Sequence, residues 1–293
     1  MKLSFTSEEV ENWRDRIHRR LPQLAVRTRH QALKFINDVG FCFAFKSEGS
    51  ELPCLWHSVC GARNPVMPRH THEDPALSFV WEMKNVLPGL GKIFYGKALK
   101  RRPTMISLEY LSYFYVLAGR TGARDEHLSE FMRGSLSVTA REIMDALADS
   151  SPQVTKGLRL AVGKNAPGDR EAFDKAITEL QMKMFIVKTD ELYSPFTFVW
   201  APLRKVFPAQ IRKARKISLE LARDKILEKY FRNQLIGSVE TINKLFGWSK
   251  QVTYQSLGRL VQNGIVVPQV KVDGKNHSFY CLVGGYGHRG RIQ

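Results

Sequence analysis

Apolar residues recur along this chain in one order: a stretch with helical spacing, a tight turn, and a run with the alternation of β-strands. In the clearest example, which begins at Ser249, the residues at helical spacing are Tyr254, Leu257, Leu260 and Val261. Asn263-Gly264 ends this helix, and strand-like runs over 265–272 and 278–283 flank an Asp273-Gly274 hairpin turn. A helix, a turn and a hairpin in this order form the C-terminal half of a winged helix.

The same pattern occurs twice more, earlier in the chain. Its second copy comprises a helix at 170–181 and strands at 184–188 and 196–200, and a weaker third copy comprises a helix at 28–39 and β-rich runs at 41–46 and 52–57. Further helices are expected over 7–20, 76–86, 108–117, 126–132, 139–148, 153–162, 219–232 and 239–246. Residues suited to helix caps precede or open several of these helices: Ser7, Thr28, Ser107, Ser218, Ser238 and Ser249. The sequence therefore predicts an α+β, helix-rich fold of three tandem winged-helix units.

These elements divide the 293 residues into five segments. They are a first winged-helix-like unit (1–61), a basic and aromatic connecting segment with helices (62–134), a second winged-helix unit (135–202), a third winged-helix unit (203–284) and a mobile basic tail (285–293). The connecting segment opens with a loop rich in proline and polar residues, and the tail is rich in glycine and arginine.

The charge of the chain indicates what kind of partner it binds. The formal net charge of +17 favours a polyanion, and nucleic acid is the first candidate. Two groups of cations have no acidic residue among them: Lys97, Lys100, Arg101 and Arg102, and then Arg204, Lys205, Arg212, Lys213, Arg215 and Lys216. Phosphate neutralisation needs several cations on one surface, so we expect these residues, with Lys84, to contact double-stranded DNA. The alternative is a solvated helix face, which most charge runs are.

The expected helix at 250–261 carries side chains that suit phosphates and base edges: Lys250, Gln251, Tyr254, Gln255 and Arg259. The corresponding helix of the second unit carries Glu171, Asp174 and Glu179 among its cations. Carboxylates that face a groove are repelled by phosphate. We therefore expect the third unit to contact DNA and the second to act as scaffold.

The sequence contains no Walker-type loop, no Gly-x-Ser-x-Gly elbow and no complete dinucleotide fingerprint, so no cofactor is expected. One group of residues offers an alternative, a zinc site: Cys54, His57, Cys60, His70 and His72. Their spacing does not match a common structural zinc pattern, and buried cysteines also serve as small core residues, so no metal is expected. A set of aromatic residues either lines a base-stacking pocket or belongs to the core: Trp81, Tyr95, Tyr110, Tyr113, Phe114 and Tyr115.

The four cysteines are scattered, as in a protein with reduced thiols. The N-terminus lacks the apolar core of a signal peptide, and no apolar stretch approaches the ~18 residues of a membrane span. We expect a soluble, cytoplasmic protein. We also expect a monomer.

Several short blocks carry a family resemblance: 35–42, 72–76, 81–84, 95–97, 100–102 and 106–115. Together they resemble relatives of the AlkZ and YcaQ winged-helix DNA glycosylases, over roughly residues 30 to 284. This resemblance implies tandem winged-helix repeats curved around DNA and a role in DNA repair. It also implies monofunctional excision of alkylated or crosslinked purines.

The sequence departs from that family at the catalytic motif. The glycosylases use a glutamine, an aliphatic residue and then glutamine or aspartate, and no glutamine of this chain has either residue two positions later. Asp74 and Glu82 are the acids nearest the resembling blocks, and each is either a catalytic candidate or a helix cap or surface charge. The sequence therefore leaves two alternative functions. One is a DNA glycosylase that activates water with another carboxylate, and the other is a non-catalytic DNA-binding protein or transcription regulator.

Overall fold

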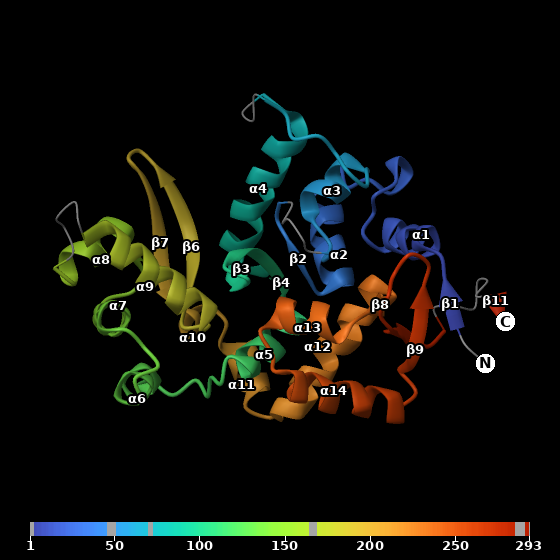
Figure 1. Cartoon of the computed structure of the whole chain (residues 1–293). Helices are drawn as coiled ribbons and strands as arrows, with labels where there is room; N and C mark the ends of the chain where they lie inside the picture. Colours follow the sequence, from blue (N-terminus) through green and yellow to red (C-terminus); the bar gives the residue numbers. More distant parts are fainter. Residues whose placement is uncertain (1–2, 46–50, 70–72, 164–168, 285–290, 293) are drawn as a thin grey trace. The chain divides into compact units, whose positions relative to one another are not determined.

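The computed structural model describes residues 3–45, 51–69, 73–163, 169–284 and 291–292. The chain forms two compact units, and each is described by itself (Figure 1). Unit 1 comprises residues 1–80 and 219–293, and unit 2 comprises residues 81–218. The fold is mixed α/β and helix-rich, as the sequence predicts. Within the described residues, no helix is both long and apolar enough to cross a membrane.

Unit 1 is built from both ends of the chain. Its N-terminal part contains β1 (Leu3–Phe5), α1 (Ser7–Ile17), a 3-10 helix (Pro22–Leu24), α2 (Arg29–Val39), β2 (Phe41–Phe43), α3 (Leu55–Cys60) and the first turns of α4 (Pro75–Gly89). Its C-terminal part contains α12 (Leu219–Gln234), β8 (Ile236–Gly237), α13 (Val239–Phe246), α14 (Lys250–Gln262), β9 (Val266–Val272), β10 (Phe279–Leu282) and β11 (Arg291–Ile292). One sheet joins the two parts in the strand order β11-β1-β9-β10-β8, and β1 runs parallel to β9.

Unit 2 contains two β-hairpins among its helices. Its elements after α4 are β3 (Ile93–Leu99), β4 (Arg102–Ser107), α5 (Leu108–Leu117), α6 (Glu126–Met132), α7 (Val138–Asp149), β5 (Gln153–Val154), α8 (Thr155–Ala161), α9 (Arg170–Met182), β6 (Ile186–Tyr193), β7 (Phe196–Pro202), α10 (Leu203–Val206) and α11 (Pro208–Ala214). The basic run at 92–103, whose structure the sequence left open, is therefore the β3–β4 hairpin. The strands β5, β6 and β7 form a sheet in the order β5-β7-β6.

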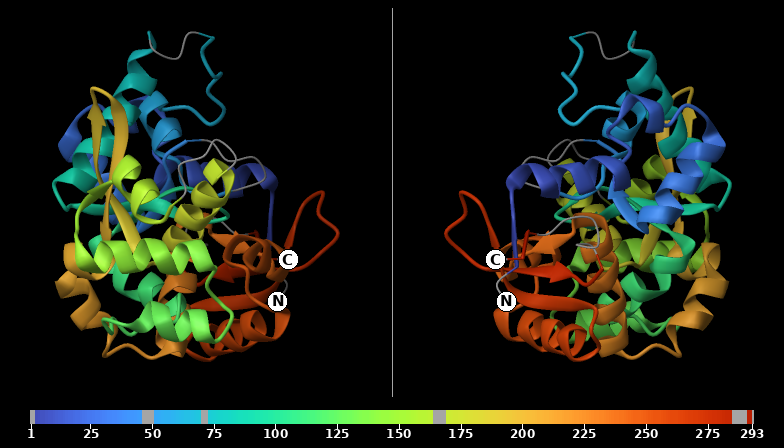
Figure 2. Two further views of the ribbon diagram at one scale, coloured as in Figure 1. Left: turned by 90° about the vertical axis from the view of Figure 1, so that its left-hand side faces the viewer. Right: turned by 90° about the vertical axis from the view of Figure 1, so that its right-hand side faces the viewer.

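Two stretches share one order of elements. The stretch from α7 to β7 and the stretch from α12 to β10 both run helix, strand, helix, helix, strand, strand. In both, the last strand lies between the other two: β7 between β5 and β6, and β10 between β8 and β9. In the two turned views, the loop that joins β9 to β10 extends away from the helices α12 to α14 of its own unit (Figure 2).

The apolar residues whose spacing predicted these helices are buried in the cores of the two units. Leu257 and Leu260 of α14 are fully buried, as helical spacing toward a core requires. In unit 2, Phe173 and Leu180 of α9 pack in one cluster with Trp200 of β7. Burying a side chain of this size stabilises a fold by about 1.5–3 kcal/mol, so these positions hold the helices against their sheets.

Side-chain caps mark most of the predicted helix starts. Thr28, Ser107, Ser238 and Ser249 accept hydrogen bonds from the first turns of α2, α5, α13 and α14, as predicted. At α1 the prediction was displaced by one residue. Thr6, and not Ser7, is the cap, because it forms a reciprocal capping box with Glu9.

Three sequence predictions about elements were wrong. The run at 52–57 was expected as a strand, but α3 covers Leu55–Cys60 and only a bridge joins Phe43 to Cys54. A short apolar run has no period that separates a buried helix from a buried strand. The helix expected at 153–162 begins with β5, because Gln153 and Val154 pair with β7. The helix expected to reach residue 20 ends at Ile17.

The predicted mobile tail falls largely outside the described residues. Residues 285–290 and 293 are not described, whereas Arg291–Ile292 pair with β1 as an antiparallel strand.

Candidate nucleic-acid interface

Two cationic residues form the turn of the β3–β4 hairpin. Leu99 and Arg102 are paired across the strands, and Lys100 and Arg101 form the two-residue turn between them. Both turn residues have left-handed backbones, with φ of 50° and 56°. Such turns favour Asn-Gly, and the left-handed region costs other residues about 1–2 kcal/mol each. Across the described part of the chain, no acidic side chain forms an ion pair with Lys100, Arg101 or Arg102. Arg101 and Arg102 are exposed, and Lys100 is half-buried.

Lys97, which precedes this turn on β3, is less available for a phosphate contact because it is held by α9. Its backbone amide donates to Oε1 of Gln181 at 3.1 Å, and its ammonium donates to Oγ1 of Thr178 at 3.1 Å. Both partners lie on α9, so β3 packs against the C-terminal half of that helix. This contact covers part of the helix that the sequence expected to be scaffold.

Lys84, also predicted to contact DNA, is buried in unit 2. Its ammonium lies 2.8 Å from Glu191 and 4.3 Å from the Trp81 ring centroid. Lys188 donates to the same carboxylate oxygen of Glu191, and burial lowers the pKa of Lys188. Burial alone would raise the pKa of Glu191, but hydrogen bonds from the two lysines lower it. Lys84 therefore serves an internal charge cluster, which the sequence did not reveal because Lys188 and Glu191 lie far along the chain.

The second cationic group lies on α10 and α11. Lys205, Arg212 and Lys216 are exposed, whereas Arg204 is half-buried. Arg215 donates to the carbonyl oxygens of Thr121 at 3.1 Å and Gly122 at 3.2 Å. The ammonium of Lys213 lies 5.6 Å from the centroid of the Tyr113 ring. Two of the six cations thus have contacts that tie α11 to neighbouring segments of unit 2.

In unit 1, α14 presents an exposed polar face. Lys250, Gln251 and Gln255 are exposed, and so is the ring of Tyr254. Arg259, at the other end of α14, is held by a carboxylate of α12 and is therefore less suited to phosphate.

On α9 of unit 2 the acids and bases neutralise each other. Lys175 lies 2.7 Å from Glu171, and Arg170 lies 3.7 Å from Asp174. The two helices therefore differ as the sequence indicated, with net positive charge only on the exposed face of α14.

The β6–β7 hairpin carries exposed aromatic rings that the sequence pattern did not single out. Tyr193 and Phe196 flank its turn at 68% and 60% exposure, with ring centroids 6.0 Å apart. Phe198 and Trp200 continue the row along β7, at centroid separations of 5.2 Å and 5.9 Å. The signal was present as Tyr-Ser-Pro-Phe between two strands. Exposed rings of this kind stack on bases or insert between them.

The two catalytic candidates lie at the start of α4 and on its exposed surface. Asp74 accepts a hydrogen bond from the backbone amide of Leu77 at 2.8 Å, which is the contact of a helix cap at the start of α4. Glu82 is exposed on α4. Three of the predicted aromatic residues, Tyr110, Phe114 and Tyr115, are buried, while Trp81 is half exposed.

The zinc alternative gains no support among the described residues. There, no three histidine, cysteine or acidic side chains are grouped so that they could hold a metal. Cys54 is buried and its thiol donates to the carbonyl oxygen of Ala44, while His70 and His72 lie outside the described residues. All four cysteines are free of disulfides.

Comparisons with known proteins agree with this architecture. Residues 26–247 match the family described as AlkZ related, and the chain belongs to that family, as its short sequence blocks indicated. Among solved structures, the DNA glycosylase AlkZ of Streptomyces sahachiroi is similar, with a TM-score of 0.62 and 12% identity over 97% of this chain and 71% of that chain. At this identity the likeness concerns the fold. No curated protein matches the chain in sequence.

Proposed function

We propose that this protein binds double-stranded DNA in DNA repair, acting as a cytoplasmic monomer. The observation that carries the proposal is the β3–β4 turn, where Lys100 and Arg101 occupy left-handed positions that glycine or asparagine would fill with less strain. Strained backbone is retained where the side chains it presents serve a function. Cations placed at a rigid hairpin tip suit phosphate contacts.

Winged-helix units form the scaffold in this proposal. The stretches from α7 to β7 and from α12 to β10 share the element order and strand order of that fold, which supports two such units. The first segment lacks a return strand where α3 stands, so its assignment rests on α2, Gly40 and β2. In unit 1, the exposed face of α14 is the surface we assign to DNA.

The test is duplex binding as a function of salt. Phosphate contacts release counterions, so affinity for a labelled duplex should fall linearly in a log–log plot, with a slope of about −0.9 per phosphate contacted. Unrelated duplex sequences should bind alike. Binding that is absent at low salt, or that ignores salt, would overturn the proposal.

A second candidate function is excision of alkylated or crosslinked purines. It is favoured by the fold, which is similar to that of a DNA glycosylase over nearly the whole chain. Its weak point is the missing glutamine motif, together with the cap role of Asp74. Incubation with DNA that bears N7- or N3-alkylated purines should then yield abasic sites, without nucleotide and in the presence of chelator. No release from any such substrate would favour the non-catalytic alternative.

A further inference from the structure

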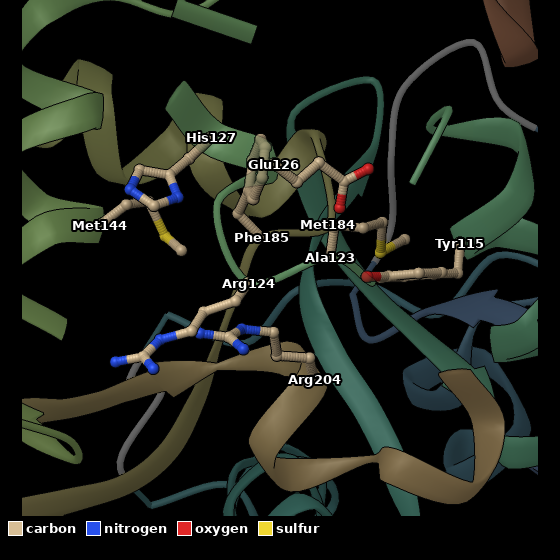
Figure 3. A pocket seen from close by; sticks show the side chains of 9 residues that line it. All are labelled: Tyr115, Ala123, Arg124, Glu126, His127, Met144, Met184, Phe185 and Arg204. Atoms are coloured by element: carbon tan, nitrogen blue, oxygen red, sulfur yellow. The ribbon is translucent and has the colours of Figure 1, made fainter. Parts of the chain in front are cut away.

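The pocket drawn in Figure 3 is too small to hold a base or a phosphate group. It lies in unit 2, and its walls come from α5, α6, α7, α10 and neighbouring loops. Its cavity volume is about 10 Å³, which is the space of about one water molecule. In unit 2, contacts with a ligand the size of a duplex therefore depend on the surface, where the β3–β4 hairpin carries its cationic turn.

The β3–β4 hairpin contains a β-bulge just before this turn. The pairing of the two strands shifts between Gly96 and Leu99, so that β3 has one more residue than β4 over this stretch. Pro103 lies opposite the bulge and has no amide hydrogen for the strand ladder. A bulge bends its strand and leaves part of the ladder unmade. The direction of the hairpin tip, with Lys100–Arg101, is therefore set at the bulge.

Gln181 of α9 satisfies the backbone of the bulge. Its Oε1 accepts the hydrogen bond from the Lys97 amide at 3.1 Å, and its Nε2 donates to the carbonyl oxygen of Ile177 at 3.2 Å. These two partners fix the orientation of the side-chain amide, because one requires an acceptor and the other a donor. Gln181 is buried, so it holds the strand from inside unit 2.

A second contact from α9 holds the side chain of the same lysine. Thr178 lies three positions before Gln181, on the same face of the helix. Its Oγ1 accepts from the Lys97 ammonium at 3.1 Å and donates to the carbonyl oxygen of Asp174 at 2.9 Å. The helix therefore fixes both the backbone and the side chain of the bulged residue.

The strand approaches α9 closely at this point. A Cβ atom added to Gly96 would lie 2.8 Å from the ring of Phe94 and 3.3 Å from Oε1 of Gln181. The first distance is too short for any side chain, so the approach requires glycine. The lack of a side chain at Gly96 thus lets Gln181 reach the next amide along β3.

Beyond the bulge the tip is held together by its own contacts. The hydroxyl of Thr104, which is fully buried, accepts from the Leu99 amide at 3.2 Å and donates to the carbonyl oxygen of Arg102 at 2.8 Å. Residues 99–104 are therefore braced across the hairpin. The tip turns as one piece about the bulge, and its direction depends on the contact with α9.

We propose that Gln181 is a positioning residue for DNA binding, which fixes the cationic tip of the β3–β4 hairpin through the Lys97 amide. It acts through the strand and touches no DNA. A tip held in one direction loses less freedom when it binds, which increases affinity. The inference rests on the proposed function, because the tip has to meet phosphates. It gives α9 a part in DNA binding besides its role as scaffold.

The first experiment measures duplex affinity at fixed salt in two backgrounds. Gln181→Met keeps the length of the side chain but replaces the acceptor oxygen by a weakly accepting thioether. It should weaken binding about three- to tenfold in the wild-type background, since an unfixed tip must be ordered on binding. In the background of Lys100→Ala, Arg101→Ala, Arg102→Ala the same change should cost less than about twofold, because coupled sites are not additive.

The matched control is Gln153→Met, the same substitution elsewhere in unit 2. Gln153 donates to the carbonyl oxygens of Ala146 and Ser150, each at 2.7 Å. Its loss should lower the melting temperature and leave DNA affinity within about twofold of wild type. Equal weakening by Gln181→Met in the two backgrounds, or equal weakening by Gln153→Met, would overturn the positioning role. So would wild-type affinity in Gln181→Met.

The second experiment follows backbone hydrogen exchange in the absence of DNA. Exchange over residues 97–102 should be faster in Gln181→Met than in wild type, and exchange over 186–188 of β6 should be unchanged. Thr178→Val, a milder change, should act in the same direction on both exchange and affinity, and it serves if Gln181→Met does not fold. Unchanged exchange over 97–102 in these variants would overturn the inference. Wild-type protein that does not bind duplex DNA would overturn the proposed function, and exchange would still decide whether Gln181 holds the tip.

Discussion

Arg259 of α14 donates two hydrogen bonds to the carboxylate of Asp224 of α12, at 2.7 Å from its Nε and at 2.8 Å from its Nη2. This contact raises the pKa of Arg259, chiefly through the hydrogen bond to the carboxylate. The side chain that the sequence assigned to DNA thus joins two helices of unit 1. The exposed start of α14, with Lys250 and Tyr254, remains for a nucleic acid.

Arg259→Ala should therefore lower stability more than it lowers DNA affinity. We expect a loss of about 1 kcal/mol in the free energy of unfolding, since the pair is partly exposed and screened by solvent. Arg232→Ala, which removes an exposed partner of Glu228 within α12, should cost less. Chemical denaturation of both variants measures this. An unchanged free energy of unfolding for Arg259→Ala would refute the helix-joining role.

Replacing the two residues of the β3–β4 turn should raise the stability of the protein and weaken its binding to DNA. Lys100→Asn with Arg101→Gly fits the left-handed backbone, so the free energy of unfolding should rise by about 1–2 kcal/mol. The same double variant should bind duplex DNA more weakly, because it removes two cations at the hairpin tip, of which Arg101 is exposed and Lys100 is half-buried. A variant that is more stable and binds DNA as tightly as wild type would remove the turn from the interface.

The triple variant Lys100→Ala, Arg101→Ala, Arg102→Ala addresses salt dependence. Its log-affinity versus log-salt slope should be flatter by about two to three units, because each cation that no longer neutralises a phosphate releases about one counterion fewer. Folding is checked by thermal melting in the same buffers. An unchanged slope would mean that these side chains do not touch phosphate.

The two helices of the winged-helix-like stretches should differ in DNA binding. Lys250→Ala with Tyr254→Ala should weaken duplex affinity at fixed salt, because both side chains are exposed on α14 and Lys250 forms no ion pair among the described residues. Arg170→Ala with Lys175→Ala should have a smaller effect, since α9 already pairs these cations with Asp174 and Glu171. A larger effect from the α9 pair would reverse the assignment of scaffold and interface.

Glu191 should set part of the acid response of unit 2. Because its pKa is lowered in the folded protein, its charge stabilises the fold above its ordinary value of 4.5, and that stabilisation is lost as pH falls below it. Glu191→Gln leaves Lys84 and Lys188 buried without a counter-charge, which costs about 3 kcal/mol or more near pH 7. The free energy of unfolding should fall less for this variant than for wild type as the pH is lowered from 7 into the acid range. An equal fall in both proteins would show that Glu191 is not ionised in the cluster.

Local features determined much of the secondary structure. Serine and threonine caps, glycine stops and apolar spacing predicted α2, α5, α13 and α14 to within a residue or two, because these signals act between neighbours in the chain. The Asp273-Gly274 turn and the order of helix and hairpin were also readable, and the short blocks of residues pointed to the correct family.

The tertiary structure decided which of the predicted cations are free. Lys84 and Arg259 look like other basic residues in sequence, but each meets a distant carboxylate, Glu191 or Asp224, that no local pattern connects to it. Charge composition is a property of the sequence, whereas the pairing of each charge depends on which side chains the fold brings within a few ångströms of it.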